Sequence, residues 1–123
     1  MRMEKYIKQY RALSDETRVR IMFLLRYAGQ PLCVCEIMDS LAISQYNASR
    51  HLNILKISGL VRGRKKGTWV FYSLSSLDDK FQNMLLLSVA SMPEQLFTPD
   101  IRRFKKRFSM REGGECVVGV QKQ

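Results

Sequence analysis

The feature that most constrains the fold is a change of hydrophobic period near residue 60. Before this point, apolar residues recur at the spacing of an amphipathic helix in three successive segments of the 123-residue chain. After it, β-branched and aromatic residues form short runs bounded by glycines, which is typical of strands. Three helices followed by a hairpin predict a mainly α fold with a small β-hairpin (α+β), built around one modest core.

Residues that favour helix ends divide the helical part of the chain. Ser14 is expected to cap the first of these three helices, and Gly29 is expected to end it. Pro31 predicts the start of the second helix, because proline is favoured in a first helical turn. Ser44 is expected to cap the third helix, which Gly59 ends. A short turn thus joins the second and third helices, as in a helix-turn-helix motif.

Further elements flank this motif. Residues 3–13 are expected to form another amphipathic helix, and residues 60–74 a hairpin with a basic loop. Helical spacing returns at about Leu77. Beyond Pro93 and Pro99 the chain is densely basic, and a short tail that opens at residue 113 is expected to be poorly packed.

The third helix and the hairpin have the composition of a DNA-binding surface. A recognition helix presents polar residues to the major groove, and the hairpin would be a wing that reaches phosphates or the minor groove. The net charge of +10 supports a polyanionic partner, with nucleic acid favoured over an anionic membrane surface. The candidate DNA-binding residues are Ser44, Gln45, Tyr46, Asn47, Ser49, Arg50, His51, Arg64, Lys65 and Lys66.

His51 is the single histidine of the chain. No second histidine or Asp stands near it at ligand spacing, so roles as a metal ligand or a base are disfavoured. We expect it to pack against the wing or to contact a phosphate.

Cys33 and Cys35 stand one residue apart, directly ahead of the predicted recognition helix. Together with Cys116 they make three cysteines, an odd number that indicates free thiols in a reducing compartment. Paired thiols hold soft metal or metalloid ions, or close a redox link. The alternative is that both cysteines are small buried apolar residues.

Two classes of function are disfavoured by the sequence. An enzyme is not indicated, because we find no nucleophile–base–acid set, no phosphate-binding glycine loop and no plausible catalytic histidine. A membrane protein is not indicated either, because the longest apolar runs are too short to span a bilayer and no export signal is visible.

Several short motifs resemble one known family. They are residues 12–18 (Ala-Leu-Ser-Asp-Glu-Thr-Arg), 49–52 (Ser-Arg-His-Leu), 58–61 (Ser-Gly-Leu-Val) and 67–70 (Gly-Thr-Trp-Val). Over roughly residues 11–90 the chain resembles the ArsR/SmtB family of metal-responsive winged-helix repressors. The run Leu-Cys-Val-Cys-Glu-Ile at residues 32–37 further resembles the signature of its arsenical-sensing branch.

The resemblance implies a cytoplasmic homodimer built from the first and last core helices, and a symmetric double-stranded operator that is released when an inducer binds. Residues 1–95 would be the winged helix-turn-helix DNA-binding and dimerisation domain, and residues 96–123 a basic C-terminal extension that carries Cys116. The inducer would be trivalent arsenic or antimony bound by thiolates, with no catalytic cofactor.

The thiol ligands depart from the family pattern. Where arsenical sensors carry a third cysteine, this chain has Met38. Either Cys33 and Cys35 suffice, helped by water or a small thiol, or Cys116 completes the site from its own subunit or from the partner. Zinc binding on the last core helix is disfavoured, because Asp78 and Asp79 have no histidine in that helix.

The spacing of the first two thiols suggests a mechanism. Residues i and i+2 of a helix lie about 200° apart, so one ion cannot reach both Cys33 and Cys35 in a regular helix. If the helix starts after Pro31, ion binding must use a frayed first turn or unwind it, and we expect unwinding. The alternative function is a redox- or thiol-responsive repressor that senses oxidants or persulfides through Cys33, Cys35 and Cys116.

The basic segment 102–107, together with Arg111, has three possible roles. It could add nonspecific DNA affinity, form a solvated helix face or flexible extension, or present Cys116 to the other thiols. Deleting the residues beyond about Pro99 should flatten the salt dependence of DNA binding if the segment binds phosphates.

Overall fold

The computed structural model describes residues 2–75, 78–114, 116 and 119. Four helices precede the hairpin: α1 (Met3–Ala12), α2 (Glu16–Ala28), α3 (Val34–Leu41) and α4 (Gln45–Ile57). The strands are β1 (Leu32–Cys33), β2 (Val61–Lys66) and β3 (Trp69–Leu74). The chain then forms α5 (Lys80–Ala90), a 3-10 turn η1 (Glu94–Phe97) and α6 (Thr98–Phe108). The mainly α fold with a small β-hairpin is confirmed.

Several predicted helix ends are confirmed by their local geometry. Gly29 ends α2 in the left-handed region, at φ 67°. The Ser44 hydroxyl accepts the backbone N–H of Asn47 at 3.1 Å and so caps α4. Gly59, at φ 83°, follows the last turn of that helix. These residues act on their own neighbours, which is why they could be identified in the sequence.

Other helix starts were predicted wrongly. Asp15, rather than Ser14, caps α2, because its carboxylate accepts the Arg18 N–H at 3.1 Å. The Ser14 hydroxyl instead donates to the Arg11 carbonyl at the end of α1, at 2.7 Å. The last core helix begins at Lys80, where Asp79 caps it; Leu77 lies outside the described residues.

The second helix also begins later than Pro31 suggested. Residues 32 and 33 form β1, and α3 starts only at Val34 with Cys33 as its N-cap. The reason is pairing with a distant strand: β1 is antiparallel to β3, with Cys33 opposite Phe71. The sheet order is β1-β3-β2.

The register divides the sheet into two faces. Leu32, Tyr72 and Gly63 are aligned across the three strands on the face that packs on the helices, where Leu32 is fully buried. Cys33, Phe71 and Arg64 are aligned on the opposite, outer face. Because neighbouring residues of a strand point to opposite faces, Arg62, Lys66 and Trp69 also belong to the outer face.

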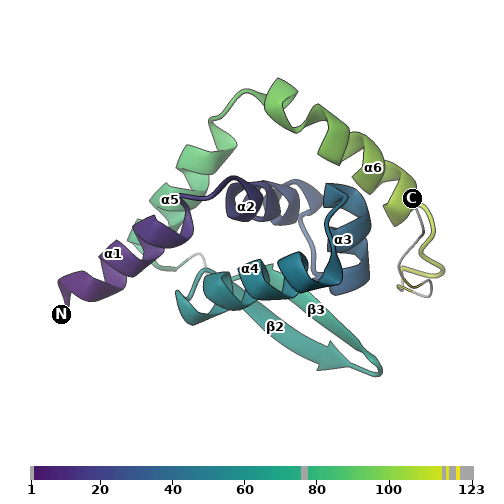
Figure 1. Cartoon of the computed structure of the whole chain (residues 1–123), viewed down its shortest axis with the longest axis horizontal. Helices are drawn as coiled ribbons and strands as arrows, with labels where there is room; N and C mark the ends of the chain where they lie inside the picture. The colour runs from purple at the N-terminus through teal and green to yellow at the C-terminus, as the bar shows by residue number, and fades with distance from the viewer. Residues whose placement is uncertain (1, 76–77, 115, 117–118, 120–123) are drawn as a thin grey trace.

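The core lies around α2, which occupies the centre of the molecule in Figure 1. Its apolar residues pack with residues of α3, α4, α5 and the sheet; the fully buried members of the core include Ile21, Leu24, Leu32, Ile37, Leu41, Leu52 and Leu55. This packing fixes α3 against α4 and places both against the sheet. No helix among the described residues is long and apolar enough to cross a membrane.

The basic C-terminal segment forms a helix, α6, that packs along α3 on the side away from the wing (Figure 1). Phe104 and Arg107 of α6 are buried. The expectation of a poorly packed tail is wrong for Cys116, which is only 4% exposed. The reason is a set of arginine contacts with α3, which the residue pattern of the tail did not indicate.

Candidate thiol site and DNA-binding surface

Cys33 lies at the junction of β1 and α3. Its backbone is extended (φ −75°, ψ 159°), and its N–H donates to the Glu36 Oε1 at 3.0 Å as part of a capping box. Cys35 is the second residue of the helix itself. Cys33 therefore stands outside the helix, and the geometric conflict between positions i and i+2 does not arise. The premise that ion binding must fray or unwind a helix turn after Pro31 is wrong.

Tertiary structure brings the three cysteines together. The Cys33 Sγ lies 2.8 Å from the Cys116 Sγ, although the residues are 83 apart in sequence. Cys35 belongs to the same buried cluster. Trp69 and Phe71 of β3 pack against the cluster. Met38, at the position where a third cysteine was expected, is buried outside this cluster.

Two arginines from the C-terminal segment border the thiols. The Arg107 Nε donates to the Asp39 Oδ2 at 2.7 Å, and its Nη2 lies 3.9 Å from the Cys116 Sγ. Arg111 binds Glu36 through two bonds, Nε to Oε2 at 2.6 Å and Nη2 to Oε1 at 2.7 Å. These arginines have internal partners, whereas Arg102 of the same segment is exposed.

The environment favours a protonated Cys33 in the unliganded protein. Burial, the hydrogen bond with Cys116 and the nearby Glu36 charge raise the pKa of Cys33, against the lowering effect of the backbone N–H of Glu36. Burial tends to raise the pKa of Glu36, but Arg111 and the Cys33 N–H hold it below its ordinary value. An ion that binds here must therefore displace thiol protons.

The cluster has the dimensions of a small ion site. The Cys33 Sγ, the Cys116 Sγ and a carboxylate oxygen of Glu36 lie within 4.8 Å of one another, and all three residues are buried. A ligand set with two or three sulfurs selects soft, thiophilic ions over hard oxygen-binding ions. Cys35 packs in the same buried cluster, but its Sγ does not lie within 4.8 Å of all of these atoms.

The candidate recognition surface is largely exposed. Ser44, Gln45, Tyr46, Asn47, Ser49 and Arg50 are exposed along the N-terminal part of α4, and Arg64, Lys65 and Lys66 at the end of the wing. Tyr46 is 73% exposed, so its ring is accessible to a groove of DNA. These residues thus lie on the exposed side of α4 and at the end of the hairpin, which extends from the core in Figure 1.

His51 differs from its neighbours because it is buried, at 5% exposure. It lies against α2: its Nδ1 is 3.1 Å from the Arg18 Nη1 and 3.7 Å from the Asp15 Oδ2. Its Nε2 is 3.2 Å from the Arg50 Nη2. The structure thus places it between α2 and α4 and next to an exposed arginine of the recognition helix.

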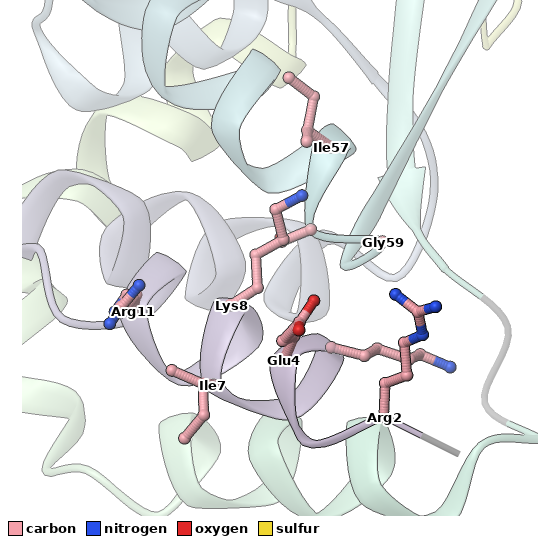
Figure 2. A pocket seen from close by; sticks show the side chains of 9 residues that line it. Arg2, Glu4, Ile7, Lys8, Arg11, Ile57 and Gly59 are labelled. Atoms are coloured by element: carbon pink, nitrogen blue, oxygen red, sulfur yellow. The ribbon is translucent and has the colours of Figure 1, made fainter.

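A groove separates α1 from the C-terminal end of α4. Figure 2 shows Lys8 extending from α1 toward Ile57 and Gly59. A cation near a helix C-terminus interacts favourably with the helix dipole. The Gln9 Nε2 also donates a hydrogen bond to the Ser58 carbonyl at this end of α4, at 3.0 Å. The groove carries Arg2, Lys5 and Arg11 as well. The Gln9 hydrogen bond helps to hold α1 against the end of α4. The residues that line the groove include none of the cysteines and none of the candidate recognition residues.

Comparisons with known proteins agree with this fold. Residues 15–62 match the family described as "Bacterial regulatory protein, arsR family". The HTH-type transcriptional regulator MJ1325 of Methanocaldococcus jannaschii is 44% identical over 88 residues, which cover 69% of this chain and 96% of that protein. The arsenic resistance transcriptional regulator ArsR1 of Pseudomonas putida is 35% identical over 94 residues, covering 76% of this chain and 73% of that protein.

A solved structure shows the same architecture. The homodimeric winged helix-turn-helix DNA-binding domain of Mb0332 from Mycobacterium bovis superposes with a TM-score of 0.64 at 26% identity, covering 76% of this chain and 83% of that one. The family match includes α2 to the start of the wing, the part that carries Cys33, Cys35 and the candidate recognition residues of α4. The chain therefore belongs to the ArsR family of winged helix-turn-helix transcriptional regulators.

Proposed function

We propose that the protein is a transcriptional repressor that binds a double-stranded operator as a homodimer and releases it when trivalent arsenic or antimony binds its cysteine thiolates. The observation that carries this proposal is the buried cluster of Cys33, Cys35 and Cys116 packed against the wing. No catalytic cofactor is needed, because binding alone changes the affinity for DNA.

Operator binding rests on α4 and the wing. The exposed Gln45, Asn47 and Arg50 offer the donors and acceptors that read base edges in a major groove. The cations at the end of the wing would neutralise phosphates beside that groove. His51 is buried, so its contribution is to support Arg50 rather than to touch DNA.

The dimer would use α1 and α5. Tyr6 and Tyr10 of α1 contact the Phe81 ring of α5, at centroid distances of 4.8 and 5.3 Å, so the two helices lie together. This pair of helices exposes the large apolar side chains Met3, Ile7, Tyr10, Met84 and Leu87. An apolar surface shared by two helices favours a protein partner, and the M. bovis relative is described as homodimeric.

The inducer follows from the donors and from the relatives. Thiolates prefer soft ions, and the P. putida relative is named for arsenic resistance. Cys33, Cys35 and Cys116 would supply three sulfurs, which removes the need for a cysteine at the position of Met38.

The signal would pass through the wing sheet. At metal–sulfur distances of about 2.3 Å, two thiolates that share one ion lie roughly 3.5 Å apart or more. The Cys33 and Cys116 sulfurs are already in contact, so an ion that enters between them must displace the side chains packed around the cluster. Phe71 packs on this cluster and lies opposite Arg64 in the sheet, so the displacement reaches the wing directly.

The test uses reduced protein and a duplex selected by that protein from a random pool. We expect arsenite to lower the DNA affinity of the native protein by roughly 5- to 150-fold, measured by fluorescence anisotropy. Cys33→Ser and Cys35→Ser should bind the duplex normally but retain it in arsenite. The proposal fails if both variants still release the duplex.

A redox-responsive repressor is the second candidate, because the Cys33 and Cys116 sulfurs are already in contact. Peroxide would oxidise the two thiols to a disulfide, taking two electrons and two protons and being reduced to water. Release of the duplex by peroxide, but not by arsenite under reducing conditions, would favour this function over metalloid sensing.

A further inference from the structure

Three arginines of the C-terminal segment face α3. They stand at intervals of four residues, and each binds an oxygen of α3: Arg103 the Ser40 carbonyl at 2.8 Å, Arg107 the Asp39 carboxylate and Arg111 the Glu36 carboxylate. Arg103 and Arg107 share one face of α6, because residues four apart lie on the same side of a helix, whereas Arg111 lies beyond the end of α6 at Phe108.

The two contacts nearest the thiols are buried. The side chains of Arg107 and Asp39 are 2% and 7% exposed, and those of Arg111 and Glu36 are 7% and 1% exposed. Charge-assisted pairs of this kind are strong and directional, and the paired bonds of Arg111 fix its orientation. A buried, fully oriented pair holds its neighbours in one position.

The same guanidinium groups also bind the chain on both sides of Cys116. The Arg111 Nη1 donates to the Gly114 carbonyl at 3.3 Å, and the Arg107 Nη2 donates to the Gly119 carbonyl at 3.3 Å. The Arg107 Nη2 also lies 3.9 Å from the Cys116 Sγ. Each arginine therefore links α3, which carries Cys35, to the residues that flank Cys116.

We propose that Arg107 and Arg111 are positioning residues that hold Cys116 against Cys33 of the same subunit, so that the third sulfur of the inducer site comes from the C-terminal segment of that subunit. This inference rests on the proposed function and assigns the ligand set of its site. Without the two arginines, Cys116 would meet Cys33 only by closing a long loop. With them, the third donor is prepared before the ion arrives, which raises affinity without any new contact to the ion.

The central variant replaces both members of the buried pair, Arg107→Gln with Asp39→Asn, so that no unpaired charge remains in the interior. Arg102→Gln is the matched control, because Arg102 lies on the same helix and is exposed. Cys116→Ser defines the signal of a site without its third sulfur. Arg107→Lys retains the ion pair but not the second donor that reaches residue 119.

Arsenite is titrated into each reduced protein, and the sulfur-to-arsenic charge-transfer absorbance per bound ion is recorded. We expect the charge-transfer absorbance per bound ion to be reduced by the same amount in Cys116→Ser and in the double variant. The arsenite affinity of both proteins should fall about 10- to 100-fold. Arg102→Gln should match the native protein, and Arg107→Lys should lie between. A merely structural role of Arg107 would lower stability without changing the amplitude per ion.

Two outcomes would overturn the inference. A double variant with the native amplitude and affinity would show that Arg107 does not position the donor. A Cys116→Ser protein with native amplitude would show that Cys116 is no ligand. Neither outcome bears on whether arsenite binding at Cys33 and Cys35 releases the DNA duplex. If Cys33→Ser and Cys35→Ser still released the duplex in arsenite, the proposed function itself would be overturned.

Mixing separates the two possible origins of Cys116. Cys33→Ser and Cys116→Ser proteins are unfolded together, refolded and titrated with arsenite. If Cys116 serves its own subunit, no mixed dimer contains a complete site and the three-sulfur amplitude is absent. Recovery of that amplitude would assign Cys116 to the partner and contradict the inference.

Discussion

At the residue scale, the neighbours of His51 set its protonation state and its hydrogen bonds. Arginine only donates hydrogen bonds, so a neutral His51 ring can accept from Arg18 or from Arg50, but not from both. Burial lowers the pKa of His51, Asp15 raises it, and the charges of Arg50 and Arg18 lower it further. The balance keeps the ring neutral in the folded protein.

Folding stability should therefore fall as the pH drops below about 6.5, the ordinary pKa of histidine. Stability falls with decreasing pH because the unfolded chain binds the proton more readily than the folded protein does. His51→Gln should lose this component, since glutamine does not titrate. Urea unfolding at about pH 5 and pH 7.5 measures the difference; an equal pH dependence in both proteins would contradict this role of His51.

Glu36 is a second residue with several simultaneous contacts. It accepts from Arg111 and from the Cys33 N–H, and so connects the C-terminal segment, α3 and β1. Its lowered pKa means that the ionised form stabilises the fold at pH values above about 4.5, and that this stabilisation is lost as the pH falls further.

Glu36→Gln should lower the free energy of unfolding by about 3–5 kcal/mol at neutral pH, because the Arg111 charge is left buried without its partner. Glu112→Gln removes an exposed carboxylate beside Arg111 and should change it by less than about 0.5 kcal/mol. Urea denaturation compares the two. Equal effects would mean that the Glu36 pair contributes no more than an exposed charge.

At the scale of elements, β1 has an importance out of proportion to its length of two residues. It joins α3 to the wing sheet, and its register places Cys33 beside Phe71 on the outer face. The wing and the thiol cluster are thus parts of one packed unit. The proposed route from the thiols to DNA therefore runs through this unit rather than through helix unwinding.

Phe71→Ala should weaken the link between arsenite binding and DNA release. We expect the ratio of DNA affinities without and with arsenite to fall about tenfold, while arsenite still binds. Val70→Ala is the control, because Val70 is the adjacent residue of β3 and points to the other face of the sheet. An unchanged ratio in Phe71→Ala would mean that the signal travels through α3 and α4 instead.

At the scale of the whole molecule, the positive charge is divided between two roles. Arg103, Arg107 and Arg111 bind acidic or carbonyl oxygens of the protein itself, whereas the cations of the wing are exposed. α6 also lies on the side of α3 away from the wing (Figure 1). The net charge of +10 already subtracts the carboxylates of these pairs, so the structure adds where the positive charge lies rather than how much of it there is.

Two triple variants test this division, each removing three positive charges. Replacing Arg64, Lys65 and Lys66 with Gln should reduce the slope of log affinity against log salt by about 0.9 for each phosphate that the wing no longer neutralises. Replacing the exposed Arg102, Lys105 and Lys106 of α6 with Gln should leave the slope unchanged. Equal reductions in both proteins would show that net charge, rather than position, sets DNA affinity.

The sequence by itself determined the features that depend on neighbouring residues. Gly29 and Ser44 end and begin helices through contacts within their own turns, and the change of period near residue 60 identified the wing. The Leu-Cys-Val-Cys-Glu-Ile run also predicts a thiol site, which stays a prediction. These signals are local, so they survive without knowledge of the packing.

Only the tertiary structure decided how the three cysteines are brought together. A strand of two residues has no periodicity to detect, and β1 exists because β3 supplies its hydrogen bonds. Cys116 reaches Cys33 because Arg107 and Arg111 bind acidic residues of α3, a match between two distant segments. Burial likewise places His51 between α2 and α4. Each result depends on partners far apart in the chain, whose pairing is set by the common core.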